Sequence, residues 1–240
     1  MKRLFLTTMA AGAGIILAGS AAVRGATLYQ NTAFTTGQVM NLPNNAQIGE
    51  QIWLGPHAGY NLTNFSFEYY SPVSTYTGPV QADVRLYMND GAPTNGYNTP
   101  GPLFYDRGTF NLTDPWQVSG NNTNTATLVF QLSDLLSGNA MNLNQSLVLP
   151  TNFTFTVTIS GMQGADAVGL PLFDPPQVGT NAGDYWYDVS GNWELLTNSI
   201  GPIAFGAQFQ GTIPEPSVLG LGALGAAALA VMARRRQRRG

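Results

Sequence analysis

The sequence contains no cysteine and only one histidine, His57, in 240 residues. Without cysteine the protein can form neither a disulfide nor a thiolate metal site, and it cannot carry a lipid on an N-terminal cysteine. One histidine is too few for the usual zinc ligand set, and no Gly-x-Ser-x-Gly turn is present to hold a hydrolase nucleophile. His57 follows Gly55-Pro56 in a segment with the composition of a loop, so we expect a loop residue.

Basic residues are almost absent from the middle of the chain. Between residues 26 and 213 there is no lysine. This segment contains two arginines, Arg85 and Arg107, and twelve acidic residues, so its formal charge is −10. A body this acidic is repelled by nucleic acid and by anionic lipid. The charge pattern therefore argues against both as partners.

The N-terminal segment has the pattern of a secretory signal peptide. Lys2 and Arg3 precede an uncharged run, Leu4 to Val23, that is rich in Ala, Gly, Leu and Ile. A positive start followed by an apolar stretch and small residues is typical of a leader that is removed on export. Cleavage is expected after Gly25 or after Ala22, and the alternative is an N-terminal helix that stays in the membrane.

The C-terminal segment has three parts in a fixed order. Pro214-Glu215-Pro216 comes first, and an uncharged span from Ser217 to Ala233 follows. As a helix this span would be ~25 Å long, near the short end of what crosses a ~30 Å hydrocarbon core. The basic run that ends the chain should stay on the cytoplasmic side, which puts the body on the other side. That run consists of Arg234, Arg235, Arg236, Arg238 and Arg239.

These three parts resemble a PEP-CTERM sorting signal, with Pro214, Glu215 and Pro216 at the motif positions. The resemblance implies that an exosortase, an integral-membrane protein, recognises the motif, removes the tail and passes the protein to the exterior of a Gram-negative bacterium that makes exopolysaccharide. The alternative is an ordinary C-terminal anchor. The expected organisation is a signal peptide (1–25), a body (26–213) and a sorting and anchor segment with a transmembrane helix (214–240).

The body shows the period of β-strands, because apolar and polar residues alternate along it. The clearest case is Asn152 to Ser160, where Phe153, Phe155, Val157 and Ile159 would face a core and the threonines between them would face outward. Four further stripes have the same pattern: Phe65, Phe67 and Tyr69; Ala82, Val84, Leu86 and Met88; Ala126, Leu128, Phe130 and Leu132; and Ile203, Phe205, Ala207 and Phe209.

Turn-forming clusters separate these stripes, and their Gly, Asn and Pro residues suit tight turns. They are Asn89-Asp90-Gly91, Thr99-Pro100-Gly101-Pro102, Ser119-Gly120-Asn121-Asn122 and Asp174-Pro175-Pro176. Short strands between such turns predict a single antiparallel β-sandwich, of jelly-roll type, with one helical turn at 133–141. Three segments, 83–91, 100–106 and 184–186, also resemble the β-sandwich bodies of other PEP-CTERM proteins, which implies the fold and no particular function.

Acidic residues suggest two kinds of site. A pair of carboxylates roughly 5 to 10 Å apart could hydrolyse a glycosidic bond, but the sequence does not select a pair. The loops that contain Asn89, Asp90 and Asp174 offer the hard oxygen ligands that Ca²⁺ prefers. Asx turns, in which Asp or Asn bonds to its own backbone, explain the same residues without a metal. No other cofactor is indicated.

Exposed aromatic residues could stack on sugar rings, and Tyr70, Tyr87 and Trp186 are the candidates. Tyr70 and Tyr87 fall on the polar side of their strands, and Trp186 lies between two tyrosines that point the other way. Packing against the sheet is the alternative for each. Together these features predict an exported, non-enzymatic surface or matrix protein that associates with exopolysaccharide. The second hypothesis is a lectin-like carbohydrate-binding module that uses these aromatics with or without Ca²⁺, and the third is a polysaccharide hydrolase.

Overall fold

The structure is a computed structural model that describes residues 25–55, 59–116, 124–131, 147–188, 190–197 and 201–212. The expected signal peptide, His57, the turn at 119–122, the helical turn at 133–141 and the whole sorting segment lie outside these residues. In the described part of the chain, no helix is long and apolar enough to span a bilayer.

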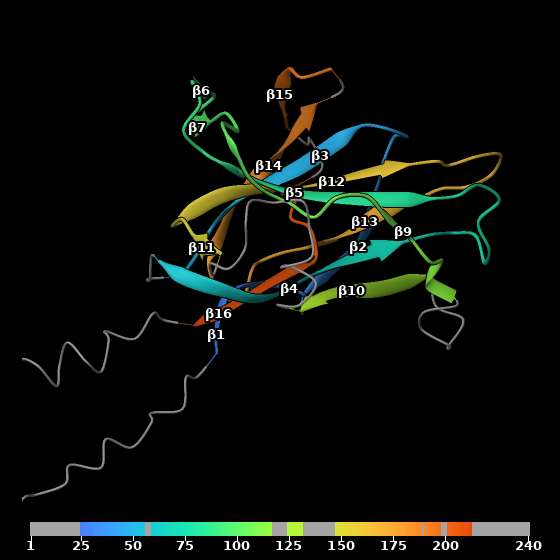
Figure 1. The fold of residues 1–240 in the computed structure, drawn as a ribbon, viewed down its shortest axis with the longest axis horizontal. Helices are drawn as coiled ribbons and strands as arrows, with labels where there is room; N and C mark the ends of the chain where they lie inside the picture. The colour runs from blue at the N-terminus through green and yellow to red at the C-terminus, as the bar shows by residue number, and fades with distance from the viewer. Residues whose placement is uncertain are drawn as a thin grey trace, which may run out of the picture.

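The described residues form two antiparallel sheets that pack face to face (Figure 1). Sheet A has the order β1-β16-β4-β13-β2. β10 and β11 also pair with β4, on the side opposite β16. Its strands are β1 (Ala26–Asn31), β2 (Thr35–Asn41), β4 (Tyr60–Tyr70), β10 (Thr125–Gln131), β11 (Val148–Leu149), β13 (Gly169–Phe173) and β16 (Ala207–Thr212).

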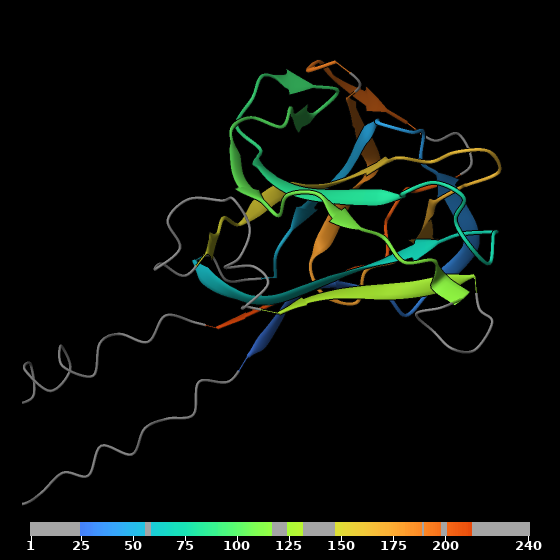
Figure 2. The same ribbon diagram turned by 45° about the vertical axis from the view of Figure 1, so that its right-hand side comes forward.

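Sheet B has the order β15-β14-β3-β12-β5-β8, and the short β9 also pairs with β5. Its strands are β3 (Gln47–Trp53), β5 (Gln81–Met88), β8 (Leu103–Asp106), β9 (Phe110–Asn111), β12 (Asn152–Ser160), β14 (Thr180–Asp188) and β15 (Trp193–Leu196). A hairpin of β6 (Pro93–Thr94) and β7 (Tyr97–Asn98) lies in the connection from β5 to β8. This hairpin and β15 stand on the side of sheet B that faces away from sheet A (Figures 1 and 2).

The core lies between the sheets and is rich in phenylalanine. Phe209 of β16 occupies its centre, with its ring centroid 5.1 Å from that of Phe153, 5.7 Å from Phe155 and 5.5 Å from Phe65. Phe153 and Phe155 belong to sheet B and Phe65 to sheet A, so one side chain ties the two layers together. Edge-to-face and offset pairs of this kind add to the free energy gained by burying the rings.

The sequence pattern is confirmed most closely at β12, which spans Asn152–Ser160 as expected and buries Phe153, Phe155, Val157 and Ile159. The stripes in β4 and β5 and the one that enters β16 are also buried, except that Met88 is half-buried. In β10, Ala126 and Phe130 are buried and Leu128 is half-buried, while Leu132 lies outside the described residues. An all-β, antiparallel sandwich is therefore confirmed.

Candidate functional site

The outer face of sheet B carries a connected group of polar side chains from neighbouring strands. Residues of β12 alternate between core and outer face, and Thr156, between buried Phe155 and Val157, points outward. In the register, Thr156 pairs with Gly49 of β3 on one side and with Arg85 of β5 on the other. This row continues through Arg85 to Asp106 of β8.

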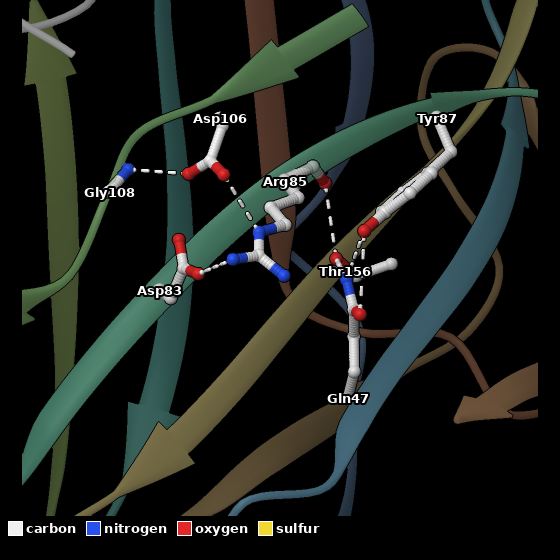
Figure 3. A network of polar contacts seen from close by, with 7 residues as sticks. All are labelled: Gln47, Asp83, Arg85, Tyr87, Asp106, Gly108 and Thr156. Atoms are coloured by element: carbon white, nitrogen blue, oxygen red, sulfur yellow. Dashed lines mark hydrogen bonds and ion pairs between the residues drawn. The ribbon is translucent and has the colours of Figure 1, made fainter. Parts of the chain in front are cut away.

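Tyr87 and Gln47 meet above Thr156 (Figure 3). The Gln47 amide donates to the Tyr87 hydroxyl at 3.0 Å and to Thr156 Oγ1 at 2.7 Å. Thr156 Oγ1 in turn donates to the backbone carbonyl of Arg85 at 3.3 Å. Three strands therefore contribute to one hydrogen-bonded group, and Tyr87 is held across the sheet with its ring half-buried.

Arg85 lies between two carboxylates on the same face (Figure 3). Its Nη2 is 2.8 Å from Asp83 Oδ2, and its Nε donates to Asp106 Oδ2 at 3.0 Å. The other oxygen of Asp106 accepts the backbone N–H of Gly108 at 2.7 Å, which fixes the carboxylate. Burial raises the pKa of Asp83 to about 6; Arg85 acts against this rise and nearby Asp106 adds to it.

An aromatic pair crosses this face. The ring of Tyr87 meets that of Trp193 in β15 edge to face, with centroids 5.3 Å apart. Both rings are half-buried, so part of each faces solvent. At the end of the face near the hairpin, Tyr97 contacts Trp53 and its hydroxyl donates to Ala182 O in β14 at 2.7 Å. The hairpin is thereby fastened over the sheet.

Trp186 also occupies an outward position in sheet B, opposite Gly49, but it is fully buried. The expectation that its ring is exposed for stacking is therefore wrong. Its indole Nε1 has no hydrogen-bond partner within the described part of the protein, and the same is true of Gln51 Oε1 and Asn89 Nδ2. Because buried polar atoms are normally hydrogen-bonded, these two donors and one acceptor suit water or the hydroxyl groups of a polar ligand.

The remaining predicted residues do not join this group. Tyr70 is half-buried on the outer face of sheet A, on the opposite side of the sandwich from Tyr87. Of the candidate Ca²⁺ ligands, Asn89 already uses its Oδ1 to accept from Thr154 Oγ1 at 2.7 Å, and Asp90 beside it is exposed. Asp174 follows β13 and therefore belongs to the other sheet. The described residues contain no group of three or more His, Cys, Asp or Glu side chains placed to hold a metal. Calcium binding stays a prediction.

A second polar feature lies inside the core, where Glu50 is fully buried. Its Oε1 accepts from Asn181 Nδ2 at 2.6 Å and from the Tyr29 hydroxyl at 3.4 Å, and its Oε2 accepts the backbone N–H of Phe205 at 2.8 Å. Burial raises the pKa of Glu50 to about 8, although the three hydrogen bonds oppose the rise. Glu50 therefore connects four segments while it stays mostly protonated near neutral pH.

Two cavities lie away from the outer face of sheet B. One, of about 390 Å³, opens between β2 and the β14–β15 edge and is lined by Gln38, Val39, Met40, Leu172, Tyr185, Thr197 and Ile203. The other, of about 300 Å³, lies beside Tyr76 and Asp114. Neither is lined by a residue that the sequence selected as a stacking or metal site.

Sequence reasoning missed Gln47, Asp83 and Trp193. Arg85 gave a weak indication, because it is one of only two basic residues in the body. To predict its contact with Asp106, one must know the register of β5 against β8. To predict the contact of Trp193 with Tyr87, one must know the order of the five strands from β15 to β5. The sequence pattern does not contain that information.

Comparison with known proteins identifies one segment. Residues 212–237 match the family model of the PEP-CTERM protein-sorting motif. The described body is thus an all-β sandwich whose last residue, Thr212 at the end of β16, is also the first residue of a sorting motif. The chain carries a PEP-CTERM sorting signal, which implies processing by exosortase, a membrane protein. Neither the curated proteins nor the solved structures gave a significant match.

Proposed function

We propose that the protein is an exported, non-enzymatic component of the cell surface or the extracellular matrix that associates with exopolysaccharide. The sorting motif supports export and a membrane-anchored precursor. In this proposal the helix from Ser217 to Ala233 holds the precursor in the inner membrane, the arginines stay in the cytoplasm, and exosortase releases the body. The sandwich that reaches the matrix follows a jelly-roll path.

The proposed contact with polysaccharide is the outer face of sheet B. A sugar ring has an apolar C–H face and a rim of hydroxyl groups that both donate and accept hydrogen bonds. Tyr87 and Trp193 offer partly exposed aromatic surface, and the carboxylates and guanidinium beside them offer fixed donors and acceptors. Sites for polar organic ligands combine these two elements. The aromatic pair next to the Arg85 ion pairs is the observation that carries this assignment.

A hydrolase is the less favoured assignment. Asp83 and Asp106 are near each other, and the raised pKa of Asp83 would suit a general acid. However, Arg85 contacts both carboxylates and holds them as an ion-paired group on a sheet face. This arrangement fixes hydrogen-bonding geometry for a bound ligand better than it frees a carboxylate for proton transfer.

Replacing both prolines of the sorting motif, in a Pro214→Ala/Pro216→Ala variant, should leave the protein in the membrane fraction. The motif is what exosortase would recognise, so its loss should prevent release while export continues. Membrane and extracellular fractions of an exosortase-containing host would be compared by immunoblot. The control is Pro93→Ala/Pro102→Ala, which changes two exposed prolines of the body. Release of the motif variant at the rate of the control would rule out sorting through Pro-Glu-Pro.

Tyr87→Ala should weaken binding to polysaccharide by roughly 5- to 30-fold, since loss of one aromatic contact in a binding site is worth about 1 to 2 kcal/mol. A glycan array, with and without EDTA, would identify a ligand, and titration calorimetry would compare the variants. Tyr70→Ala is the matched control, because that tyrosine is half-buried on the opposite outer face. Equal losses in the two variants, or no binding to any glycan, would contradict the proposed face.

A further inference from the structure

The edges of the two sheets differ in how well they are protected against pairing with another chain. Exposed edges carry unpaired backbone N–H and C=O groups, and proteins protect them with bulges, charges or short strands. The described edge strands β1 and β2 both have register shifts, and Gln30 of β1 also bonds to Val178. In sheet B, β15 has four residues and an exposed Glu194, and β8 has four residues and ends at Asp106.

The sequence of β10 and its pairing with β4 supply none of these protections. It pairs with β4 through seven consecutive positions, Thr125 to Gln131, without a register shift, and it pairs with no other described strand. Its sequence, Thr-Ala-Thr-Leu-Val-Phe-Gln, contains no charge, proline or glycine. Uncharged segments of this length with β-branched and aromatic residues are the kind that add strands to one another. In Figures 1 and 2, β10 runs along the lower margin of sheet A.

The side chains of β10 also leave apolar surface uncovered. Val129, on the outer face, is 50% exposed, and Leu128, on the core side, is only half-buried while Ala126 and Phe130 beside it are buried. A neighbouring strand on the side of β10 away from β4, where no described strand pairs, would cover both residues. Burying this apolar surface would favour association.

We propose that β10 is a self-association edge, at which a second copy of this chain adds its own β10 in antiparallel orientation and extends sheet A across both molecules. The strand is self-complementary about Leu128. Leu128 then faces Leu128, small Ala126 faces large Phe130, and Thr127 faces Val129. Each pair keeps the core side and the outer side matched, as cross-strand packing requires.

Charge favours a second copy at this edge over contact elsewhere. The body carries twelve acidic residues and two arginines, so two copies repel each other over most of their surfaces. β10 itself brings no charge into the contact. A two-fold contact of this kind is closed, because each molecule uses its one β10, and it gives a dimer.

The cysteine-free sequence allows a direct test on the full chain in detergent. Thr127→Cys and Val129→Cys variants would be mixed, oxidised mildly and run on a non-reducing gel. Directly opposed residues have Cα atoms roughly 4.5 to 5.5 Å apart, which suits a disulfide, whereas diagonal neighbours are roughly 7 to 8 Å apart. The mixture should therefore form several-fold more cross-linked dimer than either variant alone. Equal yields from the mixture and from the single variants would overturn the proposed register.

The second measurement is the mass of the full chain by light scattering. Val129→Lys should shift the protein toward monomer. In the proposed dimer the two Lys side chains, one from each molecule, would lie close together near the centre of the contact and repel each other. Val148→Lys is the matched control, since Val148 is 52% exposed in β11 of the same sheet. A wild-type protein that is monomeric at all concentrations, or equal masses for the two lysine variants, would overturn the proposal. The outcome is independent of whether sheet B binds polysaccharide.

Discussion

A Glu50→Gln variant should be less sensitive to pH than the wild-type protein, and it should become the more stable of the two as the pH approaches 8. Glu50 is fully buried, and burial raises its pKa from 4.5 to about 8. Glutamine has nearly the same shape and no charge. With its carbonyl oxygen in the place of Oε2, glutamine can still accept the backbone N–H of Phe205. Rotation of the Asn181 amide then turns an oxygen toward the new N–H₂ group.

Stability should fall with rising pH because the pKa of Glu50 is raised in the folded protein. A folded-state pKa above the unfolded value means that the folded protein binds the proton more tightly. The contribution of Glu50 to the free energy of unfolding is therefore complete below pH 4.5 and is lost as the pH rises to about 8. The loss is about 1.4 kcal/mol per pH unit, on the order of 3 to 5 kcal/mol over the window. Asp83, whose pKa is about 6, adds a smaller loss of the same sign.

Urea unfolding at a series of pH values would measure this effect, and the difference between wild type and variant isolates Glu50. Glu194→Gln is the control, because Glu194 is exposed in β15. We expect the Glu194 variant to follow the wild-type curve. If the Glu50 variant also ran parallel to wild type between pH 5 and 8, Glu50 would not be a buried, protonated group.

Phe209→Ala should destabilise the protein by about 3 to 5 kcal/mol, the range measured for removing a phenylalanine from a packed core. The ring is fully buried and lies within 6.4 Å, centroid to centroid, of Tyr29, Phe65, Phe153 and Phe155. These neighbours come from three strands besides Phe209's own and from both sheets. They cannot all move into the space without losing their own contacts.

Thermal and urea unfolding would measure this loss, and Phe34→Ala would serve as the control. Phe34 precedes β2 and is 54% exposed, so its truncation should change stability by less than about 1 kcal/mol. Phe209→Leu should fall between the two because it leaves a smaller cavity. A loss for Phe209→Ala as small as that for Phe34→Ala would mean that the two sheets do not share one packed core.

Much of the fold could be predicted from local pattern. Alternation in Asn152–Ser160 gave the bounds of β12 and its buried face, because a strand with one face in a core repeats every two residues. The same period did not reveal that Thr154 and Thr156 on the other face are also fully buried. Thr156 bonds to Gln47, which also holds Tyr87, and Thr154 bonds to Asn89, and these partners lie far away in sequence.

The candidate site was predicted only in part for the same reason. Tyr87 was identified because it lies on the polar side of β5. Trp186 was identified because it alternates with two tyrosines in β14, and it is buried. Tyr70 was equally plausible from its sequence and lies on the other sheet. An alternating pattern separates two faces of a strand, and it does not show what lies over each face or which strands are neighbours.

The position of β16 has a mechanical consequence. β16 lies between β1 and β4, it pairs with both, and its last residue, Thr212, begins the sorting motif. In an anchored precursor, tension from the membrane would enter the body at Thr212. Tension along β16 would have to slide it past two neighbouring strands, so that hydrogen bonds on both sides share the load and must break together. An edge strand that is pulled perpendicular to its own axis would instead lose its hydrogen bonds one at a time. The fold therefore connects the tether to a strand that is hydrogen-bonded on both sides.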